Sequence, residues 1–306
     1  MSLLPIIIAG LINGSFVVPV RLIKNASNEK IWFYHSLIGF SLIPWVILFF
    51  LSSSVFQDYV TLAPNLWGVI IVGGLIFGFG QVCFSYAIKK IGMAISFAIN
   101  LGIGVTLGSM YVVFHDSALS TTQSYLVTLA VLCIVLSLVF YYFSEKIKTH
   151  YHTGWLLALF AGIASGFQNI TFVYVGFYAN AQFHSMNSFW VWPPFLLAAA
   201  VPMVILFFTQ MKRNHENLSL PTFNSLILVG LMGLSFTGSL ALYSSGMSQL
   251  LPEQKMIGWP ILNVLIILTS QVWGGFFGEL QNTHKIYRII SLLLLIISIG
   301  LLSIRL

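Results

Sequence analysis

The fold is decided by residues 77–108, which read FGFGQVCFSYAIKKIGMAISFAINLGIGVTLG. Two glycine-rich apolar runs flank one basic pair, Lys89 and Lys90, and neither run contains a charged residue. Both runs continue beyond this stretch, far enough to supply the roughly 20 residues that a helix needs to cross the hydrocarbon core of a bilayer. The stretch therefore predicts two transmembrane helices joined by a short basic turn.

The whole chain has the same character. Of its 306 residues, 58% are apolar and 7% are charged, whereas soluble domains carry about 25% charged residues. So few charged side chains could not cover a surface that faces water. The composition therefore excludes a soluble globule, a disordered chain and a nucleic-acid-binding domain. The alternation that a membrane barrel requires is not found, so helices are the expected crossing elements. The sequence predicts an all-α membrane protein.

Charges, prolines and polar clusters divide the chain into ten expected transmembrane helices. They fall at 3–23, 31–51, 65–88, 92–114, 121–143, 153–177, 187–209, 222–247, 254–277 and 285–304. We expect two five-helix repeats, 1–146 and 147–306. Because five crossings is an odd number, the second repeat enters the membrane inverted relative to the first. The helices at 121–143 and 285–304 hold few small residues, so we expect them at the periphery, where they could join a homodimer.

Matching residues in the two halves support this inverted repeat. They occur in three segments, in the same order and at slowly growing offsets. The pairs are Gly10 and Gly162, Gly14 and Gly166, Gly73 and Gly230, Tyr86 and Tyr243, Asn100 and Asn263, and Thr106 and Thr269.

The distribution of basic residues indicates the orientation. Of the 13 lysines and arginines, all but Lys255 and Arg305 follow the odd-numbered helices. Basic segments resist translocation, so we expect the odd-numbered loops in the cytoplasm and both termini on the periplasmic or outer side. The expected location is the bacterial inner (plasma) membrane.

Polar amides near the middle of the predicted helices are the main candidates for substrate binding. Burying an unpaired amide costs about 1–3 kcal/mol, so each needs a partner. Interhelical hydrogen bonds would supply one, and so would a polar, uncharged solute such as a sugar. The amides are Asn13, Gln81, Asn100, Gln168, Asn169 and Asn263.

Trp259 and Asn263 recur four residues apart with Lys255, so the three share one helix face. An aromatic plane can stack on a pyranose while an amide binds its hydroxyls, which makes Trp259 a candidate sugar contact. The alternative is an interfacial anchor. That anchoring position is the one we expect for the other tryptophans, Trp32, Trp45, Trp67, Trp155, Trp190 and Trp192.

Three further residues are candidates for gating or coupling. Glu253 and Lys255 are opposite charges near an outer helix start, where they form either a helix-dipole pair or an outer gate. His35 lies about one turn inside the second helix and can titrate near neutrality. No P-loop, hydrolase motif or metal loop is present, so we expect no enzyme, no cofactor and no ATP-driven step.

Residues 77–108 resemble the third and fourth helices of the rhamnose/proton symporters, a branch of the drug/metabolite transporter superfamily. The likeness is carried by Gly78–Gln81, by the Lys89 and Lys90 pair, and by Gly92 and Met93. The second half is similar at Tyr243, Gly246, Pro252, Gln254, Trp259 and Glu279. The resemblance implies ten helices with both ends outside and a central cavity. The cavity would be lined by helices one, three, four, six, eight and nine, so it includes Tyr243 on helix eight.

These observations predict a secondary active transporter of a small polar solute. We expect a sugar such as a deoxyhexose or a related monosaccharide, moved by alternating access with proton coupling. Lys255 departs from the family pattern and would also suit an acidic sugar. Two alternatives remain open: an exporter of amphipathic amines or metabolites, and a non-transporting membrane sensor or scaffold.

Overall fold

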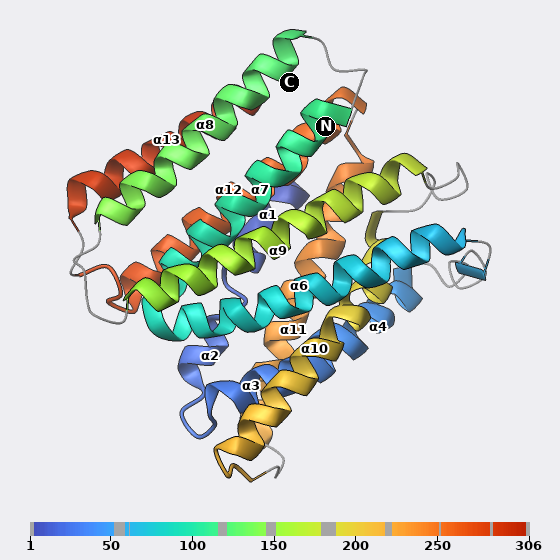
Figure 1. Cartoon of the computed structure of the whole chain (residues 1–306), viewed down its shortest axis with the longest axis vertical. Helices are drawn as coiled ribbons and strands as arrows, with labels where there is room; N and C mark the ends of the chain where they lie inside the picture. The colour runs from blue at the N-terminus through green and yellow to red at the C-terminus, as the bar shows by residue number, and fades with distance from the viewer. Residues whose placement is uncertain are drawn as a thin grey trace.

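The computed structural model describes residues 3–51, 59–60, 62–115, 121–144, 151–178, 188–217, 222–250, 252–281 and 284–303. Its regular elements in these ranges are all helical (Figure 1). The first half contains α1 (Leu4–Gly14), α2 (Val18–Leu22), α3 (Asn28–His35), the π-helix η1 (Ser36–Leu42), α4 (Ile43–Leu51), α6 (Pro64–Ile91), α7 (Met93–His115) and α8 (Thr121–Ser144). The second half contains α9 (Tyr151–Tyr178), the short 3-10 helix η3 (Ser188–Val191), α10 (Trp192–Arg213), α11 (Phe223–Ser248), α12 (Pro252–Phe276) and α13 (Lys285–Ser303).

Nine helical segments of the described residues are long and apolar enough to cross a membrane. The chain is thus an all-helical integral membrane protein, as the composition predicts. The final helix, α13, is 19 residues long and is not one of the nine. A tenth crossing and the inverted repeat remain predictions.

The expectation of one continuous helix over 3–23 is wrong, because α1 and α2 are separated by a turn at 15–17. Pro19 has no N–H to donate to the carbonyl of Ser15, so the regular hydrogen-bond ladder is interrupted. Backbone hydrogen bonds in this turn instead join residues three apart. Phe16 N donates to Asn13 O at 3.1 Å, and Val18 N donates to Ser15 O at 3.0 Å.

The second crossing also departs from a regular α-helix. It begins at Asn28, three residues before the expected start, because the Ser27 side chain accepts a bond from Lys30 N at 3.1 Å and caps the helix. Its middle, Ser36–Leu42, is a π-helix closed by a bond from Ile43 N to Ile38 O. Pro44, two residues after the π-helix, has no backbone N–H to donate. The wider π-helical turn therefore lies where the α-helical hydrogen-bond pattern is already interrupted.

Helices from the two halves pack against each other around the middle of the bundle. In the first half, α6 contacts α9 and α10, while α7 contacts α9 and α12; α1 contacts both α11 and α12. The helices α8 and α13 lie side by side at one edge (Figure 1). Only 28% of the α8 segment is buried, against 67% for Met93–Tyr111 in α7. The peripheral position expected for the fifth crossing is therefore confirmed, and the homodimer stays a prediction.

Candidate functional site

A cavity of about 470 Å³, counting its opening, lies where seven helical elements converge. Its polar lining consists of Asn13, Gln81, Asn100, Ser165, Gln168 and Asn263. Its apolar and aromatic lining consists of Phe16, Phe77, Phe84, Phe97, Leu101, Trp192, Phe236, Leu240, Trp259, Leu262 and Ile266. No charged residue is among the described side chains that line it.

Five of the six predicted amides line this cavity, and each is at most 5% exposed. Three of them are oriented by bonds within the bundle. The amide nitrogen of Asn13 donates to Ser239 Oγ at 2.7 Å, and Asn100 Oδ1 accepts from Ser165 Oγ at 2.7 Å. The amide nitrogen of Asn263 donates to the backbone oxygen of Trp259 at 2.7 Å. These bonds fix the amides while leaving each with further bonding capacity.

Two polar atoms of the cavity lining have no hydrogen-bond partner: Gln81 Oε1 and Trp259 Nε1. One is an acceptor and the other a donor, and both are buried. Leaving such an atom unpaired costs about 1–3 kcal/mol. A solute carrying hydroxyl groups could satisfy both atoms at once, because a hydroxyl both donates and accepts.

A group of phenylalanines forms the apolar wall of the cavity. The ring centroids of Phe84 and Phe97 are 5.0 Å apart, and those of Phe16 and Phe236 are 5.1 Å apart. Phe16 also lies edge-on to Phe97 at 5.6 Å. The cavity thus presents amides and hydroxyls together with a continuous aromatic surface, which suits a neutral solute with one polar side and one apolar side.

Other predicted site residues lie elsewhere. Asn169 donates from its amide to the backbone oxygen of Gly104 at 2.8 Å and is not part of the cavity lining. The ring of Tyr243 packs edge-on against Trp259 at 5.3 Å, behind the lining. Glu253 and Lys255 belong to the first turns of α12, but their side chains lie outside the described residues. The roles predicted for these residues remain predictions.

The aromatic wall was not predicted from the sequence, and several tryptophans lie away from their predicted positions. Trp32, Trp190 and Trp192 are 0%, 4% and 2% exposed, so the expectation that they anchor the membrane interface is wrong. Trp192 instead lines the cavity, 6.1 Å from Trp259 between ring centroids. One signal could have found the wall, because aromatic residues accompany the amides on the same helix face. The pairs are Asn13 and Phe16, Gln81 and Phe84, and Phe97 and Asn100.

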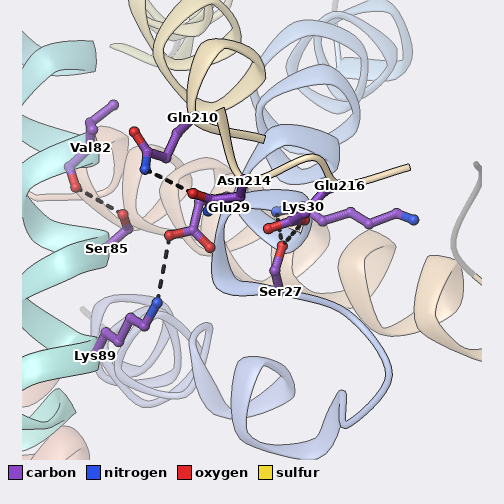
Figure 2. Close-up of polar contacts among 9 residues, drawn as sticks. All are labelled: Ser27, Glu29, Lys30, Val82, Ser85, Lys89, Gln210, Asn214 and Glu216. Atoms are coloured by element: carbon purple, nitrogen blue, oxygen red, sulfur yellow. Dashed lines mark hydrogen bonds and ion pairs between the residues drawn. The ribbon is translucent and has the colours of Figure 1, made fainter. Parts of the chain in front are cut away.

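Ionic and polar contacts join the helix ends beside the basic loops, which we call the basic end. Lys89 of α6 pairs with Glu29 of α3 at 3.5 Å, and Ser27 donates to the carboxylate of Glu216 beyond α10 (Figure 2). Arg21 of α2 pairs with Glu279, which follows α12. The second oxygen of Glu279 accepts a bond at 3.2 Å from the backbone N–H of the second residue of α7. Contacts at the basic end therefore join helices of both halves.

His35 is the last residue of α3, and its ring stacks on the cavity-lining Phe16. It is fully buried and does not line the cavity. No group of three or more metal-ligating side chains occurs within the described ranges.

Comparison with known proteins gives a limited match in sequence and a broad match in fold. No protein-family model matches the chain. Over 95 residues it is 22% identical to L-rhamnose-proton symporters of Yersinia pestis and Yersinia pseudotuberculosis. This match covers 31% of the chain and spans just over a quarter, 28%, of the symporters' length. A protein crystal structure shares the fold with a TM-score of 0.60 at 13% identity, over 98% of this chain and 95% of its own. The sequence match is therefore to part of a proton-coupled symporter, and the nine membrane-capable helices of the described residues indicate an integral membrane protein.

Proposed function

We propose that the protein is a secondary active transporter that carries a small neutral sugar together with a proton. The transport would proceed by alternating access in ten crossing helices arranged as two inverted repeats. The observation that carries the proposal is the cavity between the halves, with its unpaired Gln81 Oε1 and Trp259 Nε1. The partial likeness to L-rhamnose-proton symporters supports both the sugar and the proton.

The chemistry of the lining favours a deoxyhexose. Hydroxyl groups of the sugar would bind Gln81, Asn100 and Gln168, while its methyl group and ring face would lie against the phenylalanine wall. An acidic sugar would need a cation, and the described lining holds none. The same aromatic wall would also accept an amphipathic amine through cation–π contact, which is the observation that favours the alternative exporter.

The packing of small residues supports the inverted repeat. In the first half, Gly10 and Gly14 of α1 face α12, where an added Cβ would come within 2.5 Å of Leu265 and Thr269. In the second half, Gly162 and Gly166 of α9 face α7, where a Cβ would come within 2.8 Å of Ile103 and Leu107. The first helix of each proposed repeat thus contacts the fourth helix of the other. Such an exchange of contacts is expected if two related units enclose one site.

The closed basic end supports alternating access. By the distribution of basic residues, this end faces the cytoplasm. A transport cycle needs the cavity to open to each side in turn, so the contacts between Arg21 and Glu279 and between Lys89 and Glu29 would break when the solute is released.

Uptake of L-rhamnose into liposomes that contain the purified protein tests the proposal. We expect accumulation when the liposome interior is alkaline relative to the outside. Gln81→Ala should reduce rhamnose affinity about tenfold, because it removes a buried acceptor worth roughly 1–3 kcal/mol. The control is Gln249→Ala, which alters an exposed amide at the end of α11.

A panel of sugars, sugar acids and aromatic amines is tested in parallel. Absence of exchange or accumulation for every sugar, in protein that unfolds cooperatively on heating, would refute sugar transport. Stabilisation by amines alone would select the exporter. Full activity of Gln81→Ala would contradict the assigned site.

A further inference from the structure

We infer that His35 binds the coupling proton, and that its protonation opens the basic end of the bundle. The inference rests on the proposed symport and names the residue through which the proton acts.

His35 is the last residue of α3 and is 0% exposed. Neither Nδ1 nor Nε2 has a hydrogen-bond partner. A neutral imidazole has one donor and one acceptor, and leaving each unpaired in a core costs about 1–3 kcal/mol. An apolar side chain would fill the same space without the cost of two unpaired polar atoms. Packing alone therefore does not explain why a histidine occupies this position.

A single layer of rings separates His35 from the cavity. Phe16 lines the cavity and stacks on the imidazole, with centroids 6.1 Å apart and planes inclined by 24°. Trp32 and Phe40 enclose the imidazole edge-on at 5.4 Å and 5.3 Å. A displacement of the Phe16 ring would thus remove the side chain that lies between cavity water and His35.

The backbone on both sides of this contact is irregular. Phe16 lies in the turn between α1 and α2, and the π-helix η1 begins at the residue after His35. A Cβ at Gly39 would lie 2.7 Å from the imidazole and 2.9 Å from the Cα of Gly233 in α11. Thr237 of α11 donates to the Gly39 carbonyl at 3.1 Å. π-Helical turns are frequent at functional sites, and here the turn lets the ring and α11 approach without an intervening side chain.

Among the described residues, no charged side chain forms a hydrogen bond that would stabilise a protonated His35. The charged and titratable side chains on the helices packed around it are Arg21 on α2, Glu29, Lys30 and Tyr34 on α3, Cys83, Tyr86, Lys89 and Lys90 on α6, Lys212 and Arg213 on α10, and Tyr243 on α11. None of these forms a hydrogen bond with the imidazole. An imidazolium in this site would be a buried charge without a counter-ion, which is strongly unfavourable.

These features couple proton binding to the opening of the basic end. A proton from cavity water binds one ring nitrogen of His35, and the imidazolium that forms destabilises the closed packing of Phe16 and Trp32. Opening of the basic end hydrates the ring, and the proton leaves to water on that side together with the sugar. The neutral imidazole then restores the closed packing, so the empty carrier returns without a proton.

Transport of L-rhamnose by His35→Gln in liposomes separates proton coupling from sugar movement. We expect rhamnose exchange by the variant at equal pH to be slower than that of the wild type and not to speed up as the pH is lowered, because the uncharged amide cannot take up the proton that opens the basic end. Its accumulation ratio under an inside-alkaline gradient should fall to one. The matched control is His152→Gln, which alters an exposed histidine at the start of α9 and should accumulate rhamnose as the wild type does.

Accumulation by His35→Gln at the wild-type ratio would overturn the inference while leaving the proposed function intact. Absence of exchange by the wild type would overturn the proposed function and this inference with it. If His35→Gln does not fold, the inference is tested on the wild type instead. Calorimetry of rhamnose binding in buffers of different ionisation enthalpy measures how many protons are taken up with the sugar. We expect proton uptake on binding, and no uptake at any pH between about 5 and 8 would overturn the inference.

Discussion

Replacing Glu279 by Gln should shift the protein towards the state in which the basic end is open. Glu279 accepts bonds from Arg21 on α2 and from Ala94 N in the first turn of α7. Gly92, which ends α6 with a φ of 84°, lies against the same carboxylate. One carboxylate thus links the ends of α2, α6, α7 and α12.

The magnitude follows from the exposure of the partners. The side chain of Arg21 is 39% exposed and that of Glu279 is 10% exposed, so solvent screening limits the ion pair to about 0.5–1 kcal/mol. A carboxylate at a helix N-terminus contributes a further 0.3–1 kcal/mol, roughly. Loss of both contributions, about 0.8–2 kcal/mol in all, multiplies the ratio of open to closed molecules by about 4–30.

The accessibility of a buried thiol measures this shift. Ser96 is 0% exposed and lies one helical turn deeper in α7 than Gly92. Ser96→Cys, in a chain whose two native cysteines are replaced by Ala, should react with a water-soluble maleimide only when the basic end opens. We expect Glu279→Gln to raise the labelling rate about 4–30-fold, and the exposed charge change Lys24→Gln to leave it unaltered.

A double-mutant cycle completes the test. Arg21→Gln should raise the rate less than Glu279→Gln, and should add little in a chain that already carries Glu279→Gln, because the ion pair is then already lost. An unchanged labelling rate in Glu279→Gln, or fully additive effects of the two substitutions, would refute the idea that this pair holds the basic end closed.

Two further predictions concern stability, measured as thermal unfolding of the purified protein. Gly14→Ala should destabilise the folded protein by about 1–3 kcal/mol, because the new Cβ would lie 2.5 Å from that of Thr269. The control is Gly68→Ala, where a Cβ would have nothing within 4 Å, and we expect it to be neutral or stabilising. Equal effects of the two substitutions would contradict close packing of α1 on α12. Tyr141→Phe should cost about 1–3 kcal/mol, because it removes the buried bond to Gln271 Oε1 at 2.5 Å, whereas Tyr142→Phe, at an exposed ring, should leave stability unchanged.

The length and apolarity of the runs were sufficient to predict the helical class and the placement of most helices. A hydrocarbon core requires about 20 apolar residues per crossing, so the crossing segments are fixed by composition alone. The interruptions were not predicted, because the turn at 15–17 and the π-helix at Ser36–Leu42 depend on how neighbouring helices satisfy the freed carbonyls. Thr237 on α11, for example, bonds to Gly39 O, a contact that local sequence does not reveal.

The candidate site was predicted in its polar part and missed in its aromatic part. Amides at mid-membrane depth are conspicuous because hydrocarbon penalises them, and five of them meet at one cavity. Phenylalanines occur in nine of the ten expected crossing helices, so Phe84 and Phe97 carry no signal when each is considered alone. Trp192 was assigned to the interface by its proximity to a helix end, whereas the packing of α10 against its neighbours buries it.

The turn between α1 and α2 would give the proposed transporter a short route of communication. Asn13 and Phe16 are three residues apart on this one corner, where the first side chain meets the cavity and the second covers His35 as well. Any rearrangement that accommodates a bound solute at Asn13 therefore displaces the cover of the histidine directly, without a relay through distant helices. Substrate preference and the number of protons carried should consequently change together when this corner is altered.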